Sequence, residues 1–166
     1  MIFAARLRGR PVLAAAAAAL LVATLGAAAT DIGPWYEALR KPTWQPPNWL
    51  FGPAWTLIYA LAALAGVLAW NRIRDPAARQ RMLLLFALNA ALNVVWSELF
   101  FGLHRPDWAL LEVVPFWLSI LALVVVLWPA SPKSGVALLP YLGWVLFAAV
   151  LNYEITRLNP AFGGRA

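Results

Sequence analysis

The sequence predicts an all-α, polytopic membrane protein in which five transmembrane helices form a bundle, with a long ordered loop between the first two helices. Hydrophobic residues make up 63% of the 166 residues and charged residues only 12%. Soluble domains carry about 25% charged residues, and disordered chains are low in hydrophobic residues, so both classes are excluded. Most of the chain lies instead in apolar runs of about 20 residues, the length that a membrane helix needs.

Five apolar segments account for the expected helices, at residues 11–30, 50–72, 80–102, 107–128 and 134–158. Their leucine and alanine content favours helices. The alternation over about ten residues that marks a transmembrane β-strand is missing from them. Together with their connections the segments fill residues 1–166, so we expect a single membrane domain.

The first segment has two interpretations. Arg6, Arg8 and Arg10 precede it and three alanines close it, which is also typical of a cleavable signal peptide. Its apolar run is longer than the core of about 7–15 residues in a signal peptide. We therefore expect a first helix that is retained.

The basic residues predict the orientation. Five predicted helices place the N-terminal arginines on the same side of the membrane as Arg72, Arg74, Arg79, Arg81 and Lys133. The other side has fewer basic residues, namely Arg40, Lys41, Arg105, Arg157 and Arg165. By the positive-inside tendency the N-terminus is cytoplasmic, if the membrane is an inner one. The composition points to a bacterial protein, in an inner or an outer membrane. Because the charges lie at segment ends and not in a stripe, the net charge of +6 indicates no nucleic-acid partner.

Residues 30–48 form a connection that is long for a compact protein, and such loops are usually functional or disordered. Four prolines stiffen it, and Trp35, Tyr36 and Trp44 give it apolar surface to pack. We predict an ordered lid across one end of the bundle.

Aromatic and polar residues recur at helical spacing in three of the segments. One stripe combines Asn89, Asn93, Trp96 and Phe100; the others are Trp55, Tyr59 and Ala62, and Tyr141, Trp144, Ala148 and Leu151. Each stripe alone is explained by core packing, with asparagines bonded between helices. Three stripes beside an aromatic lid predict a pocket for a large, flat, hydrophobic ligand.

The charged and metal-binding residue types exclude several kinds of site. Glu98 and Glu112 lie near segment ends, where we expect water or Arg105 to satisfy them. The chain has no cysteine and one histidine, His104, which excludes thiolate metal sites and a bis-His haem site. We predict no metal site and no obligatory cofactor.

Small residues spaced by four predict close helix contacts. Ala62 and Gly66 form one such pair, and Ala87 and Ala91 form another on the face opposite Asn89. The second pair is our candidate face for a homodimer.

Several motifs together resemble the translocator protein family, also called peripheral-type benzodiazepine receptors, whose bacterial members are tryptophan-rich sensory proteins. The resemblance covers residues 33–160. Its motifs are Trp35-Tyr36, Lys41-Pro42-Thr43-Trp44-Gln45-Pro46-Pro47, Gly52-Pro53-Ala54-Trp55, Asn93-Val94-Val95-Trp96, Phe100-Phe101-Gly102 and Pro140-Tyr141-Leu142-Gly143-Trp144. The chain departs from the family at Ser97-Glu98, where proline often follows the tryptophan.

The resemblance implies a bundle, commonly dimeric, that binds porphyrins or sterols beneath the first loop. The matching pocket positions are Trp44, Trp55, Tyr59, Asn93, Trp96, Trp108, Trp144, Ala148 and Leu151. A sterol-recognition pattern would fall on Leu151, Tyr153 and Arg157, although this pattern is a weak one.

The function that we expect is binding of tetrapyrroles such as protoporphyrin IX and haem precursors, together with sterol-like lipids, in porphyrin handling, transport or stress sensing. The resemblance also implies an alternative, a light-dependent porphyrin-degrading enzyme, in which Trp55 and Trp144 would be the candidate participants. Another is a transporter of the same ligands, although the internal repeats common in transporters are not evident. A third is a protein whose aromatic residues only pack.

Overall fold

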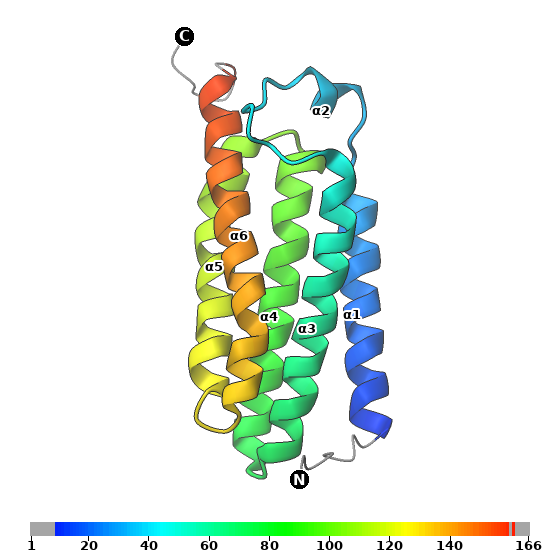
Figure 1. The fold of residues 1–166 in the computed structure, drawn as a ribbon, viewed down its shortest axis with the longest axis vertical. Coiled ribbons are helices and arrows are strands. Elements are labelled where there is room, and N and C mark those ends of the chain that lie inside the picture. The colour runs from blue at the N-terminus through cyan, green and yellow to red at the C-terminus, as the bar shows by residue number, and fades with distance from the viewer. Residues whose placement is uncertain (1–8, 160, 162–166) are drawn as a thin grey trace.

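The structure is a computed structural model that describes residues 9–159 and 161. Across these residues the chain is helical and contains no strand. Five helices are long and apolar enough to cross a membrane and stand side by side in one bundle (Figure 1): α1 (Gly9–Ala29), α3 (Phe51–Arg72), α4 (Pro76–Ser97), α5 (Pro106–Leu127) and α6 (Pro132–Leu158). The predicted fold class is confirmed. Arg6, Arg8 and Arg165 lie outside the described residues.

The helix bounds differ most from the prediction at α4, which begins at Pro76 and not near residue 80. The Asp75 carboxylate accepts a hydrogen bond from the Ala78 backbone N–H at 2.9 Å, which caps the helix. Pro76 occupies the first helical positions, where its missing N–H carries no penalty. Hydropathy missed this turn because Arg79 and Arg81 make it polar.

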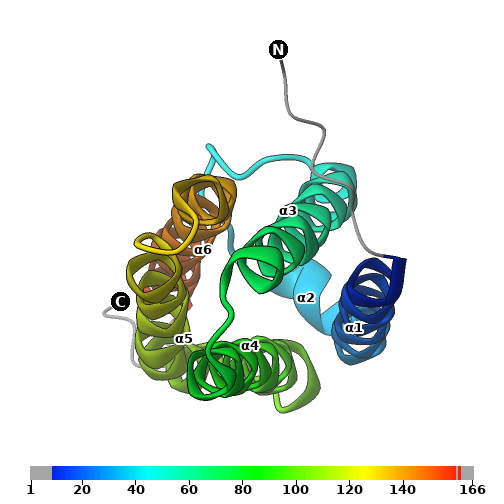
Figure 2. The same cartoon turned by 90° about the horizontal axis from the view of Figure 1, so that it is seen from below.

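The core of the bundle lies on α5, and α1 lies at the edge. Phe116, Ile120 and Leu123 of α5 are buried together with Leu138 and Val145 of α6. By contrast, the buried residue of α1 is Gly26. Viewed along the bundle, α1 stands beside α3, away from α5 and α6 (Figure 2). The helix is therefore held mainly by α3.

A buried chain of hydrogen bonds connects α6, α4 and α5. The Tyr141 hydroxyl donates to Asn89 Oδ1 at 3.1 Å, and Asn89 Nδ2 donates to Ser119 Oγ at 2.9 Å. The Ser119 hydroxyl donates in turn to the Phe116 carbonyl at 2.6 Å. Because unpaired polar groups are unfavourable in hydrocarbon, these bonds fix how the three helices are rotated against one another. The interpretation of Asn89 as an interhelical contact is confirmed.

The connection between α1 and α3 is an ordered lid, as predicted. It contains α2 (Pro34–Ala38) and the 3₁₀ helix η1 (Asn48–Leu50), and it crosses one end of the bundle (Figure 1). The Trp35 ring stacks on His104 with 4.1 Å between centroids, and His104 adopts a φ of 54°. Left-handed backbone is more frequent for histidine than for most residues.

One further contact ties the lid to the bundle, and another lies within the lid. Asn159 Oδ1 accepts from the Arg40 backbone N–H at 3.0 Å, and Asn159 Nδ2 donates to the Arg40 carbonyl at 2.9 Å. The Lys41 ammonium lies 4.3 Å from the centroid of the Tyr36 ring and donates to the Tyr36 carbonyl. Burial lowers the pKa of Lys41 and raises the pKa of Tyr36. The lid is thus tied to the C-terminal end of α6.

We expect Tyr141→Phe to lower the free energy of unfolding by about 0.6–1.7 kcal/mol, the usual range for a hydrogen bond between membrane helices. Thermal unfolding in detergent, followed by circular dichroism, measures the change. Tyr153→Phe is the control because Tyr153 is 53% exposed. An equal loss in both variants would contradict a specific role for the network.

We expect Asn159→Ala to release the lid, so that trypsin cleaves after Arg40 several times faster than in the parent protein. The physical reason is the loss of both side-chain bonds to the Arg40 backbone. Asn71→Ala, an exposed position at the opposite end of the bundle, is the matched control. Unchanged cleavage in Asn159→Ala would show that other contacts hold the lid.

Candidate functional site

A cavity of about 510 Å³ lies between the lid and the bundle, and we call it the loop-side pocket. Its volume falls within the range of about 300–1,000 Å³ that is usual for small-molecule sites. The walls come from α1, the lid, α3, the end of α4 and α6. They include Ala23, Gly26, Tyr36, Asn48, Phe51, Trp55, Tyr59, Trp96, Ser97, Phe100, Phe101, Trp144, Ala148, Leu151 and Asn152.

Aromatic rings from three transmembrane segments line the pocket. Trp55 stacks on Tyr59 with 5.4 Å between centroids, and Trp96 stacks on Phe100 at the same distance. Trp144 meets Phe51 edge to face at 5.8 Å. Aromatic rings favour offset-stacked and edge-to-face partners, so this lining suits a flat, aromatic or polycyclic ligand.

The polar groups of the pocket are few, and one of them lacks a partner. The Tyr59 hydroxyl donates to Asn93 Oδ1 at 2.9 Å, and Asn93 itself is buried behind it. The indole nitrogen of Trp96 is also buried, but it has no hydrogen-bond acceptor in the described part of the chain. A buried donor left unpaired is destabilising by about 1–3 kcal/mol. Because Trp96 Nε1 has no exposed surface, an acceptor on a ligand reaches it only when the neighbouring rings shift.

Gly26 shapes the wall that α1 contributes. A Cβ atom at this position would lie 3.5 Å from the Tyr59 hydroxyl, in ordinary van der Waals contact. A larger side chain at Gly26 would therefore fill the space beside Tyr59 and Asn93.

The structure brings most of the predicted pocket residues together. Those that line the cavity are Trp55, Tyr59, Trp96, Trp144, Ala148 and Leu151. Asn93 lies one layer behind, bonded to Tyr59. Trp44 and Trp108 are each 47% exposed and do not line it. The first packs on Phe147, and the second lies under the Arg105 guanidinium, 4.0 Å from the ring centroid.

The residues of the sterol pattern do not share one surface. Leu151 is buried and lines the loop-side pocket, whereas Tyr153 is 53% exposed. Arg157 forms an ion pair with Glu154 at 2.7 Å. The candidate dimer residues Ala87 and Ala91 are both exposed on α4.

The expectation that Arg105 satisfies Glu112 is wrong. Arg105 pairs with Asp107, whose Oδ1 lies 2.8 Å from Arg105 Nε. Asp107 is only two residues away, in the first turn of α5, and so it reaches the guanidinium before Glu112 can. Both Glu112 oxygens are buried without a partner among the described residues. Within residues 9–159 no cluster of His, Asp and Glu is suited to a metal ion.

Sequence reasoning missed the π-helix η2 (Glu98–Gly102) that extends α4. Its wider turn is closed by the bond from the Leu103 N–H to the Glu98 carbonyl at 2.7 Å. The turn lets Phe100 and Phe101 both reach the pocket. Such bulges are frequent at functional sites. The one feature of the sequence that marked this position was Ser97-Glu98, because the family often has proline after the preceding tryptophan.

Comparisons with known proteins agree with this architecture. The TspO/MBR family profile matches residues 13–158. Tryptophan-rich protein TspO of Archaeoglobus fulgidus is 40% identical over 132 residues, 79% of this chain and 84% of that protein. Protein CrtK of Rhodobacter capsulatus is 38% identical over 128 residues, 77% of this chain and 80% of that protein.

Human translocator protein is 34% identical over 133 residues, which is 79% of each chain. The family profile covers four of the five candidate membrane spans completely and the first from residue 13 onward. The resemblance seen in the sequence motifs is therefore confirmed. The chain is an integral, multi-pass membrane protein that belongs to the TspO/MBR family.

Proposed function

We propose that the protein binds tetrapyrroles such as protoporphyrin IX and haem precursors in the loop-side pocket, and acts in porphyrin handling, transport or stress sensing. The observation that carries the proposal is the aromatic wall of Trp55, Trp96 and Trp144, in which the buried Trp96 indole N–H has no partner among the described residues. A porphyrin matches both features of the pocket. Its flat aromatic macrocycle can stack on the aromatic wall, and its carboxylate side chains can accept a hydrogen bond from Trp96. Sterol-like lipids, with a flat apolar body and one hydroxyl, are the second ligand class.

The lid controls access to this site. Tyr36 and Asn48 contribute to the pocket from the lid, and both belong to its hydrogen-bonded cluster with Gln45. A large ligand enters from the lid side only if these residues move. Tethering of the lid by Asn159 therefore sets the rate of entry by this route.

The distribution of basic residues supports an orientation for the site. The start of α1 and the connection from α3 to α4 lie at the end of the bundle opposite the lid (Figure 1), and these segments carry Arg10, Arg72, Arg74 and Arg79. Under the positive-inside tendency that end is cytoplasmic, so the loop-side pocket opens toward the other side of the membrane. Labelling of single cysteines introduced at Asn71 and Thr43 with a membrane-impermeant reagent distinguishes the two orientations.

One observation favours light-dependent degradation as a second candidate function. Trp55 and Trp144 line the same cavity from α3 and α6. A bound porphyrin would contact both indoles, and indoles beside a photoexcited macrocycle can be oxidised or pass electrons. Transport of the same ligands is a third candidate, which flux into liposomes tests.

We expect Trp96→Phe to weaken binding of protoporphyrin IX by at least tenfold, because a hydrogen bond to a charged acceptor is worth about 1.5–3 kcal/mol. A fluorescence-quenching titration in detergent measures the dissociation constant. Trp117→Phe is the matched control: it also removes one indole N–H, but that group donates to the Leu142 carbonyl, outside the pocket. Equal affinity in Trp96→Phe and the parent protein would refute the proposed contact.

Illumination of the protoporphyrin complex separates an enzyme from a binding protein. If the protein degrades porphyrin, the macrocycle absorbance falls, a bilin-like absorbance appears, and Trp144→Phe slows both changes at equal occupancy. We expect the dark sample to remain unchanged. The same rate of loss for free and bound porphyrin would rule out catalysis.

A further inference from the structure

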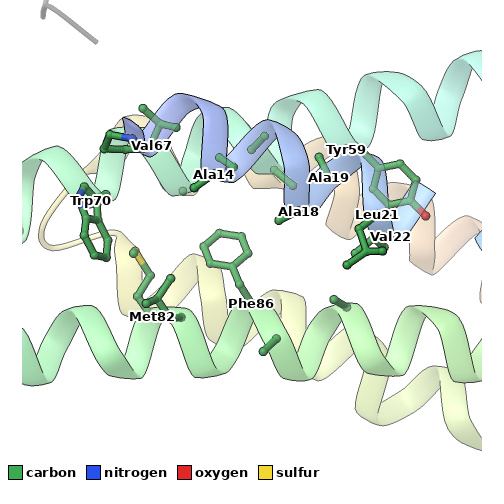
Figure 3. A pocket seen from close by; sticks show the side chains of 18 of the residues that line it. Ala14, Ala18, Ala19, Leu21, Val22, Tyr59, Val67, Trp70, Met82 and Phe86 are labelled. Carbon is green, nitrogen blue, oxygen red and sulfur yellow. The ribbon is translucent and has the colours of Figure 1, made fainter. Parts of the chain in front are cut away.

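A second and larger hollow lies nearer the opposite end of the bundle, between α1, α3 and α4 (Figure 3). We call it the α1 groove; its volume is about 930 Å³. Its walls include Ala14 and Ala18 of α1, Val67 and Trp70 of α3, and Met82 and Phe86 of α4. The proposed porphyrin site does not use this space, and the candidate dimer residue Ala87 lies on its wall.

The groove exists because the side chains that face it are short. Figure 3 shows alanines of α1 on the side of the gap that faces α4, from which the longer Met82 and Phe86 side chains reach into the gap. Gly66 of α3 adds to the space, since a Cβ atom there would still lie 3.7 Å from the Phe86 ring. An unfilled gap of this size would leave many wall atoms without van der Waals contacts. An apolar occupant would restore them.

We propose that the α1 groove binds one acyl chain of an anionic phospholipid, with the lipid phosphate at Arg10. The groove extends along α1 from Arg10 to Val22, about 18 Å at 1.5 Å per residue. One leaflet contributes about half of the roughly 30 Å hydrocarbon core. The groove therefore matches the depth of a single leaflet, and a chain entering at Arg10 reaches its inner end near Tyr59.

The charge at the mouth favours an anionic head group. Arg10 lines the groove and is exposed, and it forms no ion pair with any carboxylate in residues 9–159. Arg79 is already engaged, since its Nε donates to the Ile73 carbonyl at 2.8 Å and its guanidinium lies over Trp70. Arg10 is thus available to a phosphate, and each basic residue near a membrane surface contributes about 1 kcal/mol toward anionic lipid.

The site is separable from the loop-side pocket. Tyr59 belongs to the walls of both, and its bond to Asn93 holds it between them. A substitution near the middle of the groove, at Ala18, should therefore block an acyl chain without changing porphyrin binding. Failure of the porphyrin proposal would leave this inference unaffected.

Native mass spectrometry of the delipidated full chain in detergent tests the inference, with phosphatidylglycerol and phosphatidylcholine of identical acyl chains as probes. We expect the parent protein to retain one phosphatidylglycerol, with about fivefold preference over phosphatidylcholine. Ala18→Phe should lose the bound lipid. Ala16→Phe, on the exposed opposite face of α1, should retain it. Arg10→Gln should keep a lipid but lose the preference.

Equal lipid retention in Ala18→Phe and Ala16→Phe would overturn the proposal. A second result would also overturn it: the parent protein forms a dimer without bound lipid, and Ala18→Phe dissociates that dimer. A second copy of the chain would then fill the groove. Phosphatidylglycerol with brominated chains gives a readout that needs no groove-filling variant. The brominated lipid should quench the fluorescence of Trp70, so the parent protein should be quenched more strongly than Trp70→Phe. Equal quenching of the two proteins would also overturn the proposal.

Discussion

The structure depends on how buried amides are satisfied inside a bundle that offers them no water. Asn89 and Asn93 lie one turn apart on α4, and both are buried. The first bonds to Tyr141 of α6 and Ser119 of α5, and the second accepts from Tyr59 of α3. Rotation of α4 about its axis would break these hydrogen bonds and leave the two amides unpaired inside the membrane, where each unpaired polar group is unfavourable. The same rotation determines where Trp96, one turn further along, points.

Among the described residues, Gln45, Trp96 and Glu112 have a buried side-chain polar atom without a partner, and of the three only Trp96 lines the loop-side pocket. Its ring packs on Phe100 in the pocket wall, but its N–H finds no acceptor in the described chain. The Tyr59 hydroxyl is already bonded to Asn93, so the pocket offers a ligand mainly aromatic surface, and Trp96 offers a donor once the rings around its buried nitrogen shift. The π-helix that follows Ser97 places two more phenylalanines beside it.

The sequence was sufficient for the five spans and for the aromatic stripes, because both rest on hydropathy and helical spacing. Helical spacing was enough to predict that Trp55, Tyr59, Trp96 and Trp144 line one pocket. It could not show that Trp108 lies beneath Arg105, or that Arg105 pairs with Asp107, since those depend on the turn around His104. The α1 groove was also not predicted, because a run of alanines gives no signal of what it leaves empty.

The bundle therefore presents two apolar hollows, one walled by aromatic rings and covered by the lid, the other walled largely by the alanines of α1 and bordered by Arg10. A crystal structure of the complex with protoporphyrin IX tests the central claim most directly. We expect the macrocycle between Trp55, Trp96 and Trp144, with a carboxylate oxygen within hydrogen-bond distance of Trp96 Nε1. A macrocycle bound in the α1 groove or on the lipid-facing surface, with Trp96 Nε1 still unpaired, would contradict the account.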